Sequence, residues 1–183
     1  MPADRVAFPI FEFLDGTHQA IAQHLHRLHA VVDAIESTGL NAETRGLARA
    51  ALDFFNGEAA QHHLDEEKHI FPVLLASQDE AIVQIAEQLT QDHGWLEENW
   101  LQIEPSLEAA VSGNLWFNPE DLRPALEVFE ALYLDHILLE ESIAYPEAKQ
   151  RLAAYDKAGM GREMAKRREL VKRRALKLPE ADA

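Results

Sequence analysis

Cysteine is absent from this chain of 183 residues. Its absence excludes disulfide bonds, thiolate metal ligands and a cysteine nucleophile, and it gives no sign of an oxidising compartment. Glycine and proline are also scarce, with 8 of each, so long disordered or fibrous stretches are not expected. The hydrophobic share of 47% suits one globular domain with a proper core.

Long hydrophobic runs are missing too. No stretch approaches the roughly 18 apolar residues that a membrane-spanning helix needs. The first residues, MPADRVAFPIFEF, contain no long apolar core followed by a small-residue cleavage site, so no signal peptide is predicted. We therefore expect a cytoplasmic protein without a membrane span.

Basic residues are rare in the main part of the chain. Residues 1–156 hold 28 of the 32 acidic side chains but only 8 of the 17 basic ones, whereas residues 157–183 hold the other 9 basic ones. An acidic body repels nucleic acid, so no nucleic-acid partner is expected. It suits cations, although a solvated acidic surface is the commoner reason for such a charge. We predict one domain over residues 1–156 and a basic C-terminal helix or tail over residues 157–183. This tail is expected to fold back onto the acidic domain or to stay a solvated, frayed helix, rather than to bind a membrane or nucleic acid.

Helical periodicity is the main pattern that the chain does have. In four segments apolar residues recur at alternating spacings of four and three, which is typical of amphipathic helices, and no strand-like alternation stands out. Turn-forming residues at 37–41, 76–80 and 112–120 separate the four segments. Such short connections predict an all-α fold, an up-down-up-down antiparallel four-helix bundle. Asn118 and Pro119 should cap the fourth helix and open its first turn.

Each helix is predicted to turn one stripe of residues inward, and a few polar residues interrupt these stripes. A buried polar group without a partner costs about 1–3 kcal/mol, so such positions need an explanation. Two residues on antiparallel helices lie at the same height when they are equally far, in residues, from the turn that joins the helices. Four histidines, one in each stripe, meet this condition at the three turns, so they are predicted to lie at one level of the bundle. The second stripe is predicted to continue through His69 and Val73, and the fourth through Ile143. The polar stripe residues are His18, His62, Glu66, His93, His136 and Glu140, with His69 as an extra one.

Four histidines and two glutamates that converge inside a bundle indicate a metal site. Glu66 and Glu140 each follow a histidine by four residues and therefore share its face of the helix. Imidazole and carboxylate suit divalent first-row ions such as iron, with manganese or zinc as alternatives. Six ligands exceed what one four-coordinate zinc takes. The set therefore predicts a dinuclear centre with terminal histidines and two bridging carboxylates.

Neighbouring residues offer alternatives to some of these ligands. His62 is preferred to His63 because it keeps both the stripe and the spacing of four to Glu66. The same reasoning prefers Glu66 to Glu67 and Glu140 to Glu141, and the second glutamate of each pair is expected in solvent or as an outer partner of a ligand.

Four further features lie near the predicted ligands in the sequence but are not needed as ligands. His69 is predicted to be a local variation, or else an outer donor. Glu97 is either a surface residue or an extra ligand, and Tyr133 is either a core residue or a donor to a bound oxygen species. The aromatic–proline pairs at 71–72 and 145–146 are predicted to close helix ends without a chemical role.

The chain contains one motif twice, HHLDEEKHIFP at 62–72 and HILLEESIAYP at 136–146, and each copy has a lone histidine on the preceding helix, in Thr17-His18 and Asp92-His93. This doubled pattern resembles the hemerythrin-like (HHE cation-binding) family over roughly residues 8–155. The resemblance implies two helical hairpins that close around one non-heme centre of two iron ions with an oxo or hydroxo bridge. It also implies an open position for O2, NO or peroxide.

Two departures from the oxygen-carrying members of that family bear on function. Those members have a second histidine four residues after the lone histidine of the third helix, where this chain has Glu97. They also place a fourth-helix aspartate one residue later than Glu140. These departures argue against pure oxygen transport. Because the ligand set has more histidine than glutamate, high oxidation states of the metal should be less stabilised, and we expect a binding protein for sensing, storage or detoxification rather than a dedicated enzyme. The alternatives are an iron donor for iron–sulfur cluster repair, a peroxidase- or oxidase-like enzyme, and a structural zinc site.

Overall fold

The computed structural model describes residues 10–154 and 157–175, and every regular element in these ranges is a helix. This confirms the predicted all-α class. No helix in the described part of the chain is long and apolar enough to cross a membrane. The predicted domain boundary at residue 156 and the last part of the basic tail, 176–183, lie outside the described residues.

The first two helical segments meet at the predicted turn. Helix α1 spans Ile10–Thr38 and α2 begins at Ala42. Gly39 has a φ of +74°, a left-handed conformation that favours glycine. The Asn41 side chain then accepts a hydrogen bond of 3.0 Å from the backbone N–H of Thr44 and so caps α2.

The second segment is one long helix with two wide π turns in it. It consists of α2 (Ala42–Phe54), the π turn η1 (Phe55–Ala59), α3 (Ala60–Asp65), the π turn η2 (Glu66–Ile70) and α4 (Phe71–Leu75). Pro72 lies in the first turn of α4 and does not stop the helix.

The third and fourth segments follow with the expected caps. Helix α5 spans Glu80–Val111 and runs on past its internal Pro105. Asn118 caps α6 (Pro119–Leu139), with Pro119 in the first turn, as predicted. The π turn η3 (Glu140–Ala144), α7 (Tyr145–Arg151) and the short 3-10 helix η4 (Leu152–Ala154) complete this segment.

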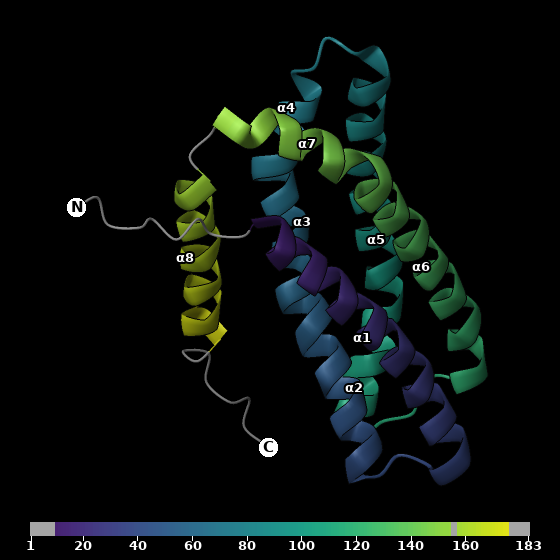
Figure 1. Cartoon of the computed structure of the whole chain (residues 1–183). Coiled ribbons are helices and arrows are strands. Elements are labelled where there is room, and N and C mark those ends of the chain that lie inside the picture. The colour runs from purple at the N-terminus through teal and green to yellow at the C-terminus, as the bar shows by residue number, and fades with distance from the viewer. Residues whose placement is uncertain (1–9, 155–156, 176–183) are drawn as a thin grey trace.

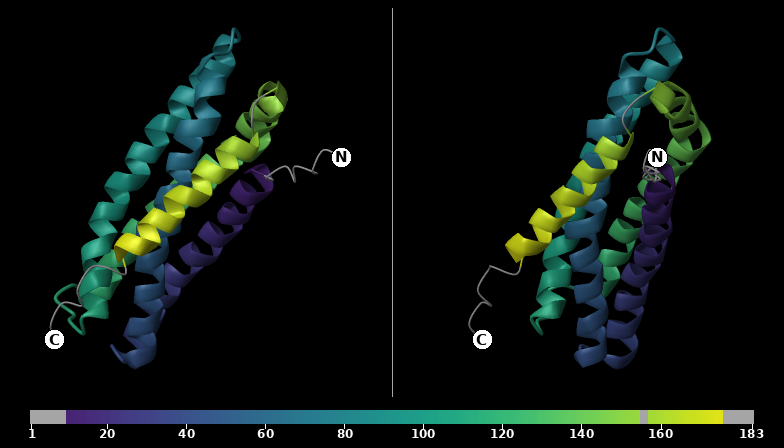
Figure 2. Two further views of the ribbon diagram at one scale, coloured as in Figure 1. Left: turned by 90° about the vertical axis from the view of Figure 1, so that its left-hand side faces the viewer. Right: turned by 60° about the vertical axis from the view of Figure 1, so that its left-hand side comes forward.

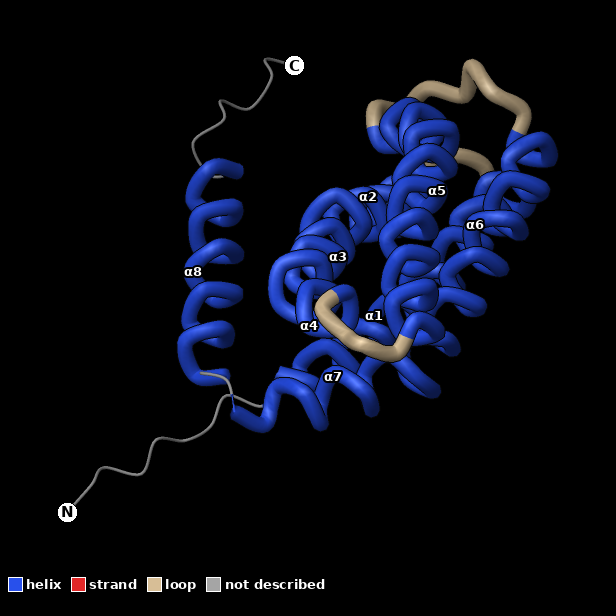
Figure 3. The backbone as a smooth tube through the Cα atoms, turned by 90° about the horizontal axis from the view of Figure 1, so that it is seen from above, coloured by secondary structure: helices blue, strands red, loops and turns tan. Residues whose placement is uncertain are grey.

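The four segments form a helical bundle. In sequence order α1 contacts α2, α2 contacts α5, α5 contacts α6, and α6 contacts α1 again. Figure 1 shows them side by side, and Figure 3 shows the same arrangement from one end.

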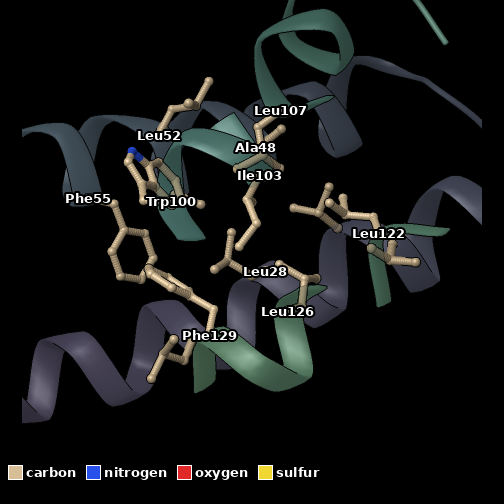
Figure 4. Packing of buried hydrophobic residues seen from close by; sticks show 14 of the residues in the cluster. Leu28, Ala48, Leu52, Phe55, Trp100, Ile103, Leu107, Leu122, Leu126 and Phe129 are labelled. Atoms are coloured by element: carbon tan, nitrogen blue, oxygen red, sulfur yellow. The ribbon is translucent and has the colours of Figure 1, made fainter. Parts of the chain in front are cut away.

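Two separate hydrophobic clusters fill the bundle. One occupies the half near the first turn and includes Leu28, Ile103, Leu126 and Phe129 (Figure 4). The other occupies the opposite half and includes Leu14, Ile70, Leu89 and Tyr145. On every segment the predicted polar residues fall between the stretches that supply the two clusters. The polar layer is thus closed off by apolar packing on both sides, which keeps bulk water away from it.

The inward-facing stripes depart from the prediction within two of the π turns, η2 and η3. Ile143 is 36% exposed, and Ala144 is buried instead. In the second segment Ile70 and Leu74 are buried, whereas the predicted His69 and Val73 are only partly buried. A π turn accommodates one more residue than an α turn, so each one advances the buried face by one position.

Helix α8 (Lys157–Ala175) lies along the outside of the bundle against α1 and α3 (Figure 2). Its Met164 is 1% exposed and belongs to the second hydrophobic cluster. Asp65 on α3 is completely buried and pairs with two arginines of α8, Arg167 at 2.8 Å and Arg168 at 2.6 Å. Of the two arrangements expected for the basic tail, its described part therefore adopts the one that folds back onto the acidic bundle.

Candidate metal centre

The structure brings all six predicted ligand residues into one buried layer. Their exposed fractions run from 0 to 5%. They form two overlapping groups, in each of which ligand atoms lie within 4.8 Å of one another. Both groups contain Glu66 and Glu140. The first group adds His18 and His62, and the second adds His93 and His136.

Each shared glutamate points one oxygen at each histidine pair. Glu140 places Oε2 at 3.1 Å from Nε2 of His18 and Oε1 at 3.1 Å from Nε2 of His136. Glu66 places Oε1 at 3.4 Å from Nε2 of His62 and Oε2 at 3.5 Å from Nε2 of His93. This is the arrangement that two carboxylates need in order to bridge two metal ions.

The two glutamates also begin two of the three π turns in the described part of the chain, η2 and η3. The carbonyl of Glu66 accepts from the N–H of Phe71, and that of Glu140 accepts from Tyr145, five residues on in each case. Pro72 and Pro146 come next and have no N–H to donate, which weakens the α-helical ladder at these points. Because π turns concentrate at functional sites, their occurrence at both glutamates supports a role for this layer.

The second glutamate of each motif holds a histidine of the other half. Glu67 accepts a 2.8 Å hydrogen bond from Nδ1 of His93, and Glu141 accepts a 2.9 Å hydrogen bond from Nδ1 of His18. Carboxylates in this position orient an imidazole and leave its Nε2 free to bind a metal. Of the two alternatives for Glu67 and Glu141, the geometry favours the outer partner.

The charges in the layer are strongly coupled. Burial lowers the pKa of His62 to about 3, so this imidazole is neutral. Burial also lowers the pKa of His136, but the nearby carboxylates of Glu140 and Asp92 outweigh it and raise the pKa to about 10. The same competition raises the pKa of His18 and His93.

Several atoms of the layer lack a hydrogen-bond partner. Within the described part of the chain these include both carboxylate oxygens of Glu140, Oε2 of Glu66, and both ring nitrogens of His62. Buried carboxylate oxygens can only accept, and leaving them unpaired is costly. Metal ions between the two histidine pairs would satisfy them, so the residues fit the metals that their chemistry suggests.

Tyr145 is a member of the layer that the sequence interpretation missed. Its pair with Pro146 was predicted only to close a helix end. In the structure its hydroxyl donates to Oε1 of Glu66 and lies 3.2 Å from Nε2 of His18. Burial raises the pKa of this phenol, so it keeps its proton. The available signal was the Tyr/Phe difference between the two motifs, because a buried tyrosine hydroxyl needs a partner.

His63 is not among the predicted ligands, because the sequence favours His62. In the structure His63 lies beside the second histidine pair, His93 and His136. Its ring stacks on that of His93 with centroids 4.0 Å apart. Ring nitrogens of His63, His93 and His136 lie within 4.8 Å of one another. No sequence signal distinguished this position from a surface histidine next to a ligand.

His69, Glu97 and Tyr133, the other residues considered for the site, lie at three different places around the six predicted ligands. His69 is an outer residue whose Nε2 lies 2.7 Å from Glu163 on α8. Glu97 is exposed and belongs to none of the metal-binding groups among the described residues. Tyr133 is 3% exposed and lines a pocket of about 540 Å³ that also reaches His63 and His93.

Comparison with known proteins gives two matches. The sequence model of the Hemerythrin HHE cation binding domain family matches residues 10–148, which include the whole polar layer. A protein of Haemophilus influenzae, described only as uncharacterized, is 28% identical over 160 residues, which are 87% of this chain and 90% of that protein.

Proposed function

The chain belongs to the hemerythrin HHE cation-binding domain family, and on this basis we propose that it is a non-heme di-iron protein that takes up O2, NO or peroxide. We infer that it acts in sensing, storage or detoxification and that its four long segments follow the up-down-up-down order of a four-helix bundle. Iron would supply a redox-active centre with an open position for such a ligand.

One observation carries the proposal: two buried glutamates are shared between two histidine pairs. His18 and His62 would hold one iron, and His93 and His136 the other. Glu66 and Glu140 would bridge them. Zinc at a structural site would not need two carboxylates shared in this way.

The other residues of the layer would keep this centre in place. Glu67 and Glu141 fix the orientation of His93 and His18 through hydrogen bonds of 2.8 and 2.9 Å. Tyr145 holds a proton next to Glu66 and thereby limits the negative charge on that oxygen. The two hydrophobic clusters exclude water from both ends.

Elemental analysis tests the proposal most directly. Protein purified without added metal or chelator should contain about two iron ions per chain, as the bridging geometry requires. His62→Ala or Glu66→Ala should lose at least one ion, whereas His26→Ala, which changes an exposed histidine of α1, should lose none. One zinc per chain, no metal after anaerobic loading with iron, or full retention by both ligand variants would refute it.

Exposure of the reduced protein to NO or O2 then separates binding from catalysis. A reversible adduct is expected. Multiple turnover with peroxide, or release of labile iron, would favour the enzymatic and iron-donor alternatives instead.

A further inference from the structure

We propose that the ligand of this centre is a small neutral molecule that enters through the pocket between α3 and α5, reaches the His93–His136 half, and contacts His63 there. This inference rests on the proposed di-iron function. The entry route, the half of the centre that the ligand reaches, and the ligand contact of His63 go beyond that function.

The two halves of the centre differ in how they are closed. At the His18–His62 half the Tyr145 hydroxyl occupies the space between His18 and Glu66. The corresponding residue of the first motif is Phe71, whose ring lies 5.2 Å from that of His93 and offers no polar atom. The doubled motif thus produces one half occupied by a hydroxyl and one half without it.

The pocket leads to the half without the hydroxyl. Its exposed rim includes Leu64 and Leu101, which are 45% and 58% exposed. Its interior includes Phe129, Tyr133 and His93, which are buried. Of the proposed iron ligands only His93 lines this pocket, and none from the His18–His62 half does.

His63 stands where the pocket meets the centre. Its Nε2 is buried and has no hydrogen-bond partner within the described residues. A ring nitrogen of His63 lies within 4.8 Å of those of His93 and His136. Because its ring is parallel to His93 within 16° and stacked on it, it lies alongside that ligand rather than opposite it. This position suits a hydrogen bond to an incoming molecule.

The charge of the pocket indicates the kind of ligand. Three carboxylates line it, from Glu67, Glu97 and Glu104. An acidic lining disfavours the entry of small anions and leaves neutral molecules unaffected. Phe55, Leu96 and Trp100 add apolar surface to the lining of the same pocket.

Blocking the pocket tests the route. Gly94 lines it, and a Cβ added there meets no atom within 4 Å, so Gly94→Leu should be tolerated and fill the opening. Gly46→Leu is the matched control, since Gly46 is an equally open glycine of α2 that does not line the pocket. Stopped-flow mixing of the reduced iron protein with NO should show association slowed at least about tenfold in Gly94→Leu, because entry then requires side chains to move. Equal rates in both variants would overturn the proposal.

His63→Leu tests the contact. This variant should retain about two irons per chain and bind NO at least about tenfold more weakly, as expected when a buried hydrogen bond is lost. Loss of iron would make His63 a metal ligand, and unchanged affinity would remove it from the site; either result contradicts the assignment.

Chemical labelling of the metal-free protein tests access to His63 without any iron being bound, so its result does not depend on the proposed di-iron function. Diethylpyrocarbonate modification followed by mass spectrometry should label His63 well before His18, and Gly94→Leu should protect His63. If the wild type holds no iron, the di-iron function fails, yet the labelling still decides whether the pocket gives access to His63. Labelling of His18 first would refute the route.

Discussion

At the scale of single residues, the polar layer combines buried carboxylates with histidines, and several of its atoms lack a hydrogen-bond partner within the described residues. Glu140 is fully buried, and although burial by itself raises its pKa, the nearby imidazoles of His136 and His18 lower it overall. The protons that neutralise the metal-free layer therefore reside on histidines. These are the same groups that would have to be neutral to bind metal.

Metal loading should consequently release protons. His136 has a pKa of about 10 in the metal-free protein and is protonated at neutral pH, so an incoming ion must displace its proton. Raising the pH towards 10 removes this competition and should strengthen metal binding, and lowering the pH should weaken it. Anaerobic titration of weakly buffered apoprotein with ferrous ion at pH 7, followed with a pH indicator, should show acidification. Iron uptake without acidification would contradict the charge assignment.

At the scale of elements, π turns determine which residues of the two repeated motifs face the inside of the bundle. Two of them, η2 and η3, begin at Glu66 and Glu140 and advance the buried face by one residue, from His69 to Ile70 and from Ile143 to Ala144. We infer that the extra residue in each turn allows Glu66 and Glu140 to face both histidine pairs while the helix continues.

Deleting Ser142, an exposed residue of η3, should convert that turn into a regular α-helix. The apolar face would keep its register, because the residue that follows the deletion moves back by one position. We expect a helical, folded protein by circular dichroism that contains less iron than the wild type. Full iron content in this variant would show that the π turn does not position Glu140.

Helix α8 is the other element whose role can be measured. It supplies both arginines that pair with Asp65, and this carboxylate is completely buried, which raises its pKa despite the two cations. A buried carboxylate next to Glu66 in sequence would otherwise be left without a counterion.

Replacing Arg167 and Arg168 together by alanine should lower the free energy of unfolding by about 3–5 kcal/mol, the usual cost of leaving a buried charge unpaired. Arg173→Ala is the control, since this arginine is exposed and pairs with Glu169 of the same helix. Adding Asp65→Asn to the double variant should restore part of the loss. Urea unfolding measures all of these differences. A double variant as stable as the control would show that Asp65 does not need α8.

At the scale of the whole molecule, the polar layer lies between two hydrophobic clusters contributed by all four segments. Ions bound there would tie the four segments together at mid-height. A ligand that binds only the folded state stabilises it by mass action.

Removal of metal should therefore lower the melting temperature. Differential scanning calorimetry of iron-loaded protein should show a clear decrease after dialysis against a chelator, and a smaller one for Glu66→Ala, which binds less metal from the start. The same melting temperature with and without chelator would mean that the layer holds no ion that contributes to folding.

The sequence alone determined the features that depend on local periodicity. Stripes with a repeat of 3.6 residues predicted the helices, and turn residues such as Gly39 and Asn118 predicted their ends. Polar residues within apolar stripes, counted from those turns, predicted that His18, His62, His93 and His136 would meet. Such inferences succeed because the side chains of a regular helix follow from residue spacing and rise.

Only the tertiary structure decided the features that depend on contacts between segments. Whether Tyr145 closes a helix or points its hydroxyl at Glu66 depends on a helix 79 residues away in the chain. The pairing of His69 with Glu163 depends on where α8 lies, and the position of His63 beside His93 depends on how α3 faces α5. The π turns also belong here, because their widening is stable only where the surrounding bundle keeps Glu66 and Glu140 inside. Local spacing carries no record of these long-range constraints, and packing of the complete chain resolves them.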